Sequence, residues 1–341
     1  MKVSDGPAGL ENPVEQKQQV WGGRATAFVQ RHRWWFGGSI LGIVLVVLIA
    51  GPNYLSLYSL ALAFTLFDLM ALALSWNLIG GYGGQFSIGH ALFVGTGSYT
   101  IAVLLLHTGM PLFLAMLLSG IMAAFLAFLS ALLLLRLRNA YFTVGSLGLA
   151  QAVLSWMINW SFTGQTQELS LPQRATLDYS TLYYASLALL VLTVASLVLL
   201  IRSPFGLRLM AVRDDEEAAI ELGVNSFLVK MIAFTVSAFF AGIAGALIAL
   251  QNFSIEPYSA FNTSWAINMI VMTIIGGIST TVGPLIGAVV IFVLQQQFQS
   301  NSWSTLVIGL LLIIMIRIAP EGIWVLFRKG VHRLAQITIL R

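Results

Sequence analysis

Residues 202–229 read RSPFGLRLMAVRDDEEAAIELGVNSFLV, and they form the longest charged interruption in an otherwise apolar chain. Apolar runs flank this stretch at residues 179–201 and 230–251, and each is long enough to cross a hydrocarbon core of roughly 30 Å. Two membrane-length segments joined by a charged loop predict a polytopic membrane protein in which the loop lies outside the bilayer.

The composition of the whole chain supports this class. Of its 341 residues 58% are hydrophobic and 9% are charged, against about 25% charged in an average soluble chain. The chain contains no cysteine, which excludes disulfides and thiolate chemistry from its mechanism. We therefore predict an all-α polytopic bundle of transmembrane helices with no separate soluble domain.

Working outward from the charged loop, we divide the chain into ten apolar segments, at residues 34–51, 55–79, 90–108, 111–135, 141–160, 179–201, 230–251, 264–280, 283–299 and 303–319. Glycines between residues 264 and 299 interrupt the hydropathy, so eight spans with half-inserted pieces are the alternative count. The expected organisation is an N-terminal segment at 1–33, a transmembrane domain at 34–319 and a C-terminal tail at 320–341.

The distribution of positive charge predicts the orientation. Strict alternation of the ten segments places sixteen of the seventeen Lys and Arg residues on one side of the membrane, with Arg174 as the exception. Positively charged loops are enriched on the cytoplasmic side. We therefore expect both termini and the loop at 202–229 to be cytoplasmic.

Glycine is concentrated in two segments. Gly80–His90 read GGYGGQFSIGH, and Gly276–Pro284 read GGISTTVGP. Each glycine inside a helix costs about 1 kcal/mol relative to alanine, so both segments are expected to break helices. Broken helices at membrane depth line cavities or are buried in protein, and in transporters they mark solute paths. The alternative interpretation of the first segment is a tight turn followed by close helix packing.

The two glycine segments resemble each other, which suggests an internal repeat. On this pattern we expect the following residues to line or shape a solute path: Asn77, Gly80, Gly81, Gly83, Gly84, Gln85, Ser87, Gly89, His90, Gly276, Gly277 and Gly283. Packing at a helix end is the alternative role for His90, because no second ligand stands at metal spacing. Tryptophans near the predicted span ends, among them Trp76 and Trp156, are typical of interfacial anchors.

Asp68 is the clearest ionisable residue inside a predicted span. A charged carboxylate at that depth costs about 2.5–3.5 kcal/mol on insertion scales, so it is a candidate residue of the solute path. A protonated or hydrogen-bonded structural role is the alternative. No second carboxylate lies nearby in the spans to complete a proton relay.

The charged loop itself predicts a short helix. Asp214 or Asp215 suits its start, and Gly223 suits its end. Ser226 is expected to cap the helix that continues into the next span. Ala218, Ala219, Ile220 and Leu222 give the short helix an apolar side that nothing nearby in sequence covers, which favours a docking role over a solvated loop.

Glu217–Gly223 read EAAIELG, which matches the Glu-Ala-Ala-x-x-x-Gly motif of permease subunits in ATP-binding-cassette importers. Further runs resemble the permeases for branched-chain, or hydrophobic, amino acids, in particular the M-type member of a two-permease pair. These runs are LSWNLIGGYGGQFSIGHALFVGTGSYT at 74–100, LRLRNAYFTVGSLGLAQ at 135–151, residues 202–247, GGISTTVGPLIGA at 276–288 and APEGIW at 319–324.

The resemblance implies a location in a bacterial inner membrane and a set of partners: a related H-type permease, two cytoplasmic ATPase subunits and a periplasmic solute-binding protein. It also implies that the ATPases are contacted by Arg213, Asp214, Glu217, Ala218, Ala219 and Gly223. ATP and Mg²⁺ would bind in the partner subunits, and no cofactor is expected in this chain. The sequence agrees, because it has no Gly-x-x-x-x-Gly-Lys-Ser/Thr loop to hold phosphates. We therefore expect a permease and not an enzyme.

One departure from the family keeps the substrate open. Where the family often has a Thr-Gly-Gly run, residues 163–168 read TGQTQE. Permeases for urea and short amides resemble the same family and are the nearest alternative. Two other classes are an ion-coupled secondary transporter, with Asp68 as its ion site, and a membrane-embedded enzyme, which would need clustered carboxylates or histidines in its spans.

Overall fold

We analysed a computed structural model that describes residues 48, 50–137, 140–172, 177–298, 309–310, 317 and 322–328. The chain divides into two compact units, at residues 1–56 and 57–341. In the first unit the described part contains a 3-10 turn, η1 (Gly51–Asn53). The predicted segments at 34–51 and 303–319 lie largely outside the described residues, so the number of spans remains a prediction.

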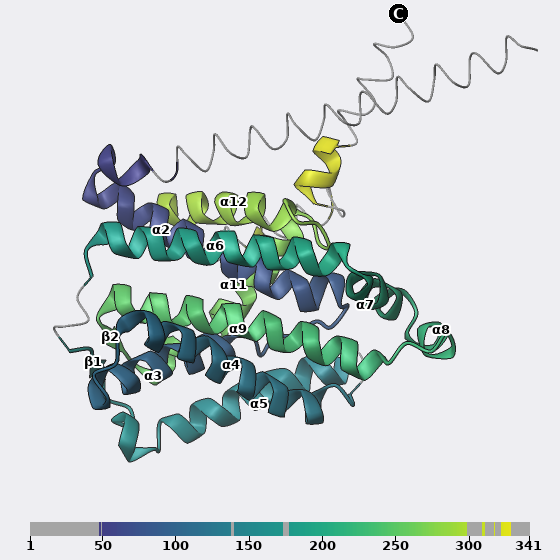
Figure 1. The fold of residues 1–341 in the computed structure, drawn as a ribbon, viewed down its shortest axis with the longest axis horizontal. Coiled ribbons are helices and arrows are strands. Elements are labelled where there is room, and N and C mark those ends of the chain that lie inside the picture. Colours follow the sequence, from purple (N-terminus) through teal and green to yellow (C-terminus); the bar gives the residue numbers. More distant parts are fainter. Residues whose placement is uncertain are drawn as a thin grey trace, which may run out of the picture. The chain divides into compact units, whose positions relative to one another are not determined.

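The second unit is a helical bundle (Figure 1). Its longer helices are α2 (Leu57–Trp76), α3 (Ala91–His107), α4 (Leu112–Leu134), α5 (Ala140–Met157), α6 (Tyr179–Arg202), α7 (Pro204–Asp214), α9 (Ser226–Asn252), α11 (Thr263–Gly276) and α12 (Gly283–Phe298). The short elements are η2 (Asn77–Tyr82), η3 (Ser161–Thr163), α8 (Glu216–Glu221), α10 (Pro257–Ala260) and the paired strands β1 (Leu169–Ser170) and β2 (Ser254–Ile255).

Four helical segments of the described chain are long and apolar enough to cross a membrane: Leu57–Tyr82, Leu112–Leu134, Tyr179–Arg202 and Ser226–Asn252. Shorter apolar helices occur at Ala91–His107 and Gly283–Gln297. These helices confirm the prediction of a polytopic helical membrane protein. α5 has 18 residues but is not apolar enough to be among the four, although the sequence analysis counted it as an ordinary span.

α9 runs through the middle of the bundle and packs against α3 and α4 on one side and against α2 and α6 on the other (Figure 1). Small residues permit this packing. A Cβ atom added to Gly97 would lie 1.9 Å from the carbonyl oxygen of Gly242, and Ser98 Oγ donates a 2.8 Å hydrogen bond to the carbonyl of Gly245. Close backbone approach through small residues is a general way in which membrane helices associate.

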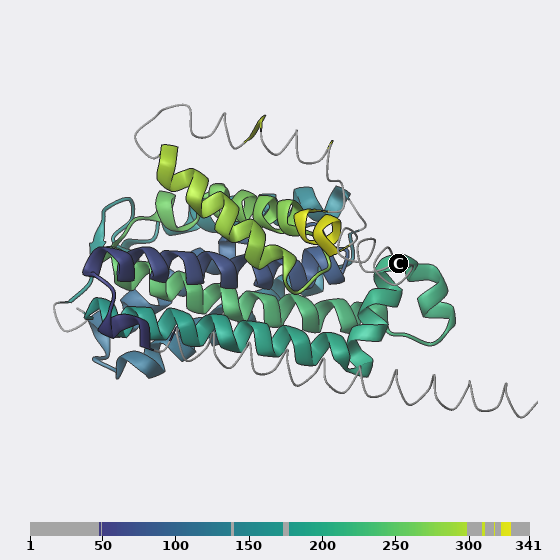
Figure 2. The ribbon, with the colours of Figure 1, turned by 90° about the horizontal axis from the view of Figure 1, so that it is seen from above.

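The two ends of the bundle differ. α7 and α8 extend from one end, and the β1–β2 pair lies at the opposite end (Figure 1). α11 and α12 pack against each other and against α2 (Figure 2). This packing brings the turn between α11 and α12 next to the end of α2, although about 200 residues separate them in sequence.

Candidate functional site

The two glycine segments meet at the end of the bundle that carries α7 and α8. The last turn of the α2 segment widens into a π-helix, η2, and α11 ends at Gly276, just before Gly277, which has a left-handed φ of +130°. Wide π turns and left-handed residues leave backbone groups without regular helical partners. Those groups become available to a neighbouring segment.

Asn77 holds the two segments together. Its Oδ1 accepts a 3.0 Å hydrogen bond from the backbone N–H of Ser279, and its Nδ2 donates a 2.8 Å bond to the carbonyl of Thr280. The side chain is fully buried. Ser279 Oγ completes the contact by donating a 2.8 Å bond to the carbonyl of Gly81. Ser279 and Thr280 were not among the predicted site residues, which were chosen for glycine content and not for the hydroxyls between the glycines.

Several glycines of these segments are required by close packing. An added Cβ would lie 2.1 Å from Asn77 Oδ1 at Gly81, 1.8 Å from the carbonyl oxygen of Gly283 at Gly276, and 2.0 Å from that of Ser146 at Gly89. Gly80, Gly81, Gly83 and Gly89 are buried. The structure thus shows the first segment as a closely packed turn, and a role in lining the solute path remains a prediction. The internal repeat is likewise untested.

Arg213 joins the charged loop to both glycine segments. Its Nη1 donates a 2.8 Å hydrogen bond to Ser279 Oγ, and its Nε and Nη2 donate bonds of 2.8 and 2.6 Å to Asp214 Oδ1. Gly84 lies against the same side chain, since an added Cβ would be 2.7 Å from Arg213 Cγ. A movement of α7 would therefore act directly on both turns.

A polar cavity of about 250 Å³ lies where these elements converge. Its walls come from the first glycine segment and from α7, α8 and α9: Gly83, Gly84, Gln85, Val212, Arg213, Asp214, Asp215, Glu216, Glu217 and Lys230. Lys230 Nζ donates a 2.6 Å hydrogen bond to Glu216 Oε2, and the lysine side chain is 6% exposed. This pair connects α8 to α9, and sequence analysis missed it because the partners are separated by a turn.

The sequence-based predictions for α8 are confirmed in part. Asp215 caps its start, because Asp215 Oδ1 accepts from the backbone N–H of Ala218 at 3.0 Å, and Gly223 follows its end with a φ of +84°. Two expectations were wrong. Asn225, not Ser226, caps α9, and Ser226 Oγ donates to Glu216 Oε1 instead. Ala219 is buried against the bundle, so the exposed apolar side of α8 is smaller than predicted.

The remaining predicted path residues lie deeper in the bundle. Asp68 is buried in α2, and among the described residues its Oδ1 has no hydrogen-bond partner. His90 Nε2 lies 2.9 Å from Ser237 Oγ, and its ring packs against Phe93 and Phe234. The described part of the chain holds no group of three or more His, Cys, Asp or Glu side chains able to bind a metal ion.

Trp76 is not the interfacial anchor that its position near a span end predicted. Its side chain is fully buried, and its Nε1 donates a 2.8 Å hydrogen bond to the carbonyl of Ser87. Phe86 packs edge-on against the same ring at 5.3 Å. The indole therefore packs against the first glycine segment and hydrogen-bonds to it. Asn77 and Arg213 contact the same segment at Gly81 and Gly84.

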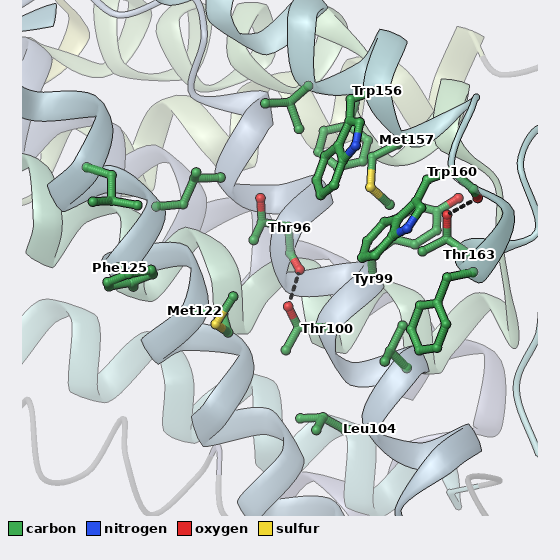
Figure 3. Close-up of a pocket in the computed structure, with 16 residues that line it drawn as sticks. Thr96, Tyr99, Thr100, Leu104, Met122, Phe125, Trp156, Met157, Trp160 and Thr163 are labelled. Carbon is green, nitrogen blue, oxygen red and sulfur yellow. Dashed lines mark hydrogen bonds between the residues drawn. The ribbon is translucent and has the colours of Figure 1, made fainter. Parts of the chain in front are cut away.

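A second, apolar cavity of about 400 Å³ separates part of α5 from α3 and α4 (Figure 3). Aromatic and aliphatic side chains make up most of its wall, including Phe125, Trp156 and Trp160. The hydroxyls of Thr96 and Thr100 donate to backbone carbonyls one turn back in α3, at 2.7 Å each. The cavity thus presents hydrocarbon surface and leaves α5 loosely attached over part of its length.

Valine at Gly84 or Gly277 is expected to block uptake while the protein still assembles. Both glycines have a left-handed φ, at +68° and +130°, which costs a side-chain-bearing residue about 1–2 kcal/mol before any clash. Uptake by membrane vesicles and co-purification of partner subunits would be measured together. Gly309→Val is the control, because its added Cβ meets no described atom within 4 Å. Unimpaired uptake by Gly84→Val would contradict the role of this turn.

Membrane-length apolar helices, interrupted by glycine turns and carrying a helical loop at one end, define a polytopic helical membrane protein. The chain belongs to the family described as the branched-chain amino acid transport system permease component, whose model matches residues 57–316. That range contains both glycine segments and the α7–α8 loop.

The relatives similar to this chain include two kinds of branched-chain amino acid permease. The high-affinity branched-chain amino acid transport system permease protein LivM is 28% identical in Salmonella typhimurium and 27% identical in Escherichia coli, each over 82% of this chain and 73% of the relative. LivH of Salmonella typhimurium is 29% identical over 39% of this chain and 44% of its own. No solved structure matches the chain.

Proposed function

We propose that this chain is the M-type permease of an ATP-binding-cassette importer for branched-chain or hydrophobic amino acids. Its partners in this proposal are an H-type permease, two cytoplasmic ATPase subunits and a periplasmic binding protein that delivers the solute. The proposal is supported by the similarity to LivM over most of the chain and to LivH over a shorter part. ATP and Mg²⁺ would bind in the partner ATPases, and this chain would hydrolyse nothing.

The observation that carries the coupling role is the exposure of α8 at the end of the bundle (Figure 1). Ile220 is 51% exposed and Leu222 is 84% exposed, and Glu217 is exposed beside them. A short helix with apolar side chains and a carboxylate at its surface suits a protein partner. We assign the ATPase contact to Arg213, Asp214, Glu217, Ala218, Ala219 and Gly223, of which Ala219 acts by packing.

The contacts of α7 and α8 suggest how ATPase closure would reach the membrane. The Glu216–Lys230 pair ties α8 to α9, and Arg213 ties α7 to the turn between α11 and α12. Asn77 then connects this turn to the end of α2. A rigid displacement of the α7–α8 loop would therefore move α2, α9, α11 and α12 together. In this proposal the α7–α8 loop faces the ATPases, so the loop and both termini lie on the cytoplasmic side of the membrane.

The test is to purify the tagged chain gently from its native membrane and to identify the bound proteins by mass spectrometry. We expect two ATPase subunits and a second permease, and Glu217→Arg or Gly223→Pro should lower the retained ATPase and its substrate-stimulated activity by about ten-fold, equivalent to about 1.4 kcal/mol. Glu168→Arg, an equal charge reversal on an exposed residue outside α8, should retain the ATPase.

Other outcomes would replace the proposal. A chain that purifies alone and transports under an ion gradient would be a secondary transporter, with Asp68 as the residue to study next. Uptake of urea or short amides in preference to leucine, by a complex that does contain ATPases, would change the substrate and keep the coupling mechanism. Full stimulated activity in Glu217→Arg would remove α8 from the ATPase contact.

A further inference from the structure

We propose that the outward face of α5, continued by the first turns of α11, lines the water-filled solute path at the boundary with the second permease. This inference rests on the proposed function and adds which surface of the chain meets the solute. The solute path in this inference does not run through the glycine segments, because these segments are packed against each other at the α7–α8 end.

α5 has two chemically different faces. Phe142, Ser146, Ala150 and Met157 are buried and attach the helix to the bundle. The exposed residues on the opposite face follow helical spacing and are Tyr141, Val144, Gly148, Gln151, Ala152 and Ser155. The amide of Gln151, the hydroxyl of Ser155 and the open Gly148 thus face outward along a helix at the edge of the bundle (Figure 1), and Asn159 is exposed just beyond its end. These polar residues and the glycine lower the mean hydropathy of α5, which is not among the four long apolar helices.

α4 shows what a lipid-facing surface looks like in the same chain. Its exposed residues are large and apolar throughout, and include Phe113, Leu117, Ile121, Phe128 and Leu132. Hydrocarbon offers no hydrogen-bond partners, so polar side chains inside a membrane face protein or a water-filled cavity. The contrast between α4 and α5 therefore indicates that α4 faces lipid and that the outward face of α5 does not.

The polar surface continues beyond α5. Gln151 Nε2 donates a 3.2 Å hydrogen bond to Thr263 Oγ1 at the start of α11. Ser264 is exposed one residue later, and Asn268 lies one turn further along. Gln295 Nε2 on α12 donates to Asn268 Oδ1 at 3.4 Å. These groups form a strip of uncharged hydrogen-bonding side chains that crosses from α5 through α11 to α12.

The N-terminal part of α5 is attached to the first glycine segment. Thr143 Oγ1 donates a 2.8 Å hydrogen bond to the carbonyl of Phe86, and Ser146 Oγ accepts a 3.2 Å bond from the backbone N–H of Gly89. The Arg213 contact acts on the same segment at Gly84. The apolar cavity behind α5 leaves the rest of the helix less tightly packed (Figure 3). α5 is thus placed to respond to the α7–α8 loop.

The chemistry of the strip fits a small zwitterion. α5 and α11 carry no Asp, Glu, Lys or Arg, so neither the ammonium nor the carboxylate of an amino acid would be held by a fixed opposite charge. Amide and hydroxyl groups can hydrogen-bond to both in turn. Weak, uncharged contacts allow a solute to leave as readily as it enters.

The absence of cysteine from the natural chain permits a direct test. In the complete ATP-driven transporter, single substitutions Ser155→Cys on α5 and Leu117→Cys on the exposed face of α4 are treated with a membrane-impermeant, positively charged methanethiosulfonate. Thiols react as thiolates, which form in water and not in hydrocarbon. We expect Ser155→Cys to react at least about ten-fold faster than Leu117→Cys, and its labelling to stop leucine uptake.

The outcomes separate this inference from the proposed function. ATP-dependent leucine uptake by the unlabelled complex is measured first, and its absence would remove the proposed function and this inference with it. With uptake intact, equal slow labelling of both cysteines would overturn the water-filled path. Rapid labelling of Ser155→Cys with full uptake retained would also overturn it, because the face would then be wet without carrying solute.

Discussion

Replacing Asn77 with leucine is expected to lower leucine uptake by at least about ten-fold, equivalent to about 1.4 kcal/mol. The substitution keeps the branched shape of the side chain but removes both hydrogen bonds that Asn77 makes to the second glycine segment. The backbone N–H of Ser279 and the carbonyl of Thr280 would be left without these partners. An unsatisfied buried group costs about 1–3 kcal/mol, so two of them are enough to separate the turns.

Two further variants make the test of Asn77 specific. Asn77→Asp keeps an oxygen that can accept from Ser279 but loses the donor to Thr280, and it should show an intermediate loss. Asn252→Leu makes the same exchange at an exposed residue at the end of α9, and it should leave uptake unchanged. Uptake is measured together with the amount of chain in the membrane. Normal uptake by Asn77→Leu would show that the contact does not transmit movement.

Replacing Glu216 with alanine is expected to have the second large effect, a loss of about ten-fold in substrate-stimulated ATPase activity of the complex. Lys230, whose side chain is 6% exposed, would lose this carboxylate partner. Removing one partner of a fully buried pair costs about 3–5 kcal/mol. The effect here should be smaller, because the Glu216 side chain is 36% exposed and partly screened by solvent.

The charge exchange Glu216→Lys with Lys230→Glu provides the control for this pair. It preserves an ion pair between α8 and α9 and should restore part of the stimulated activity, whereas either single reversal should not. Glu216→Gln keeps the acceptor for Ser226 and should fall between wild type and alanine. Equal activity of the alanine variant and the wild type would mean that the α7–α8 loop acts on the membrane helices through Arg213 alone.

Local patterns predicted a large part of this protein. Hydropathy located the helices, because each apolar run must satisfy its own backbone in a membrane, and that rule needs no knowledge of neighbours. Asp215 at the start of α8 and Gly223 just after its end were readable for a similar reason, since capping involves residues within one turn. The choice of Ser226 over Asn225 as the cap of α9 failed because both residue types suit the position, and Ser226 is used by Glu216.

The interior position of Trp76 and the burial of Ala219 were not readable, because both depend on what packs against them. The character of α5 was not readable either. Its 18 residues resemble an ordinary span, and only the comparison of its exposed face with that of α4 distinguishes it. A single helix does not specify which of its sides meets lipid, water or protein. Only the arrangement of its neighbours does.

By itself, the sequence determined the class of the protein, the positions of the long apolar helices in the described part of the chain, the two glycine breaks and the helical loop at 202–229. The tertiary structure alone decided that these parts form one site. Asn77 and Thr280 are 203 residues apart, and Arg213 bonds to Ser279 across 66 residues. Hydropathy, propensity and capping act over a few turns of chain, whereas contacts at this separation arise only when whole helices pack.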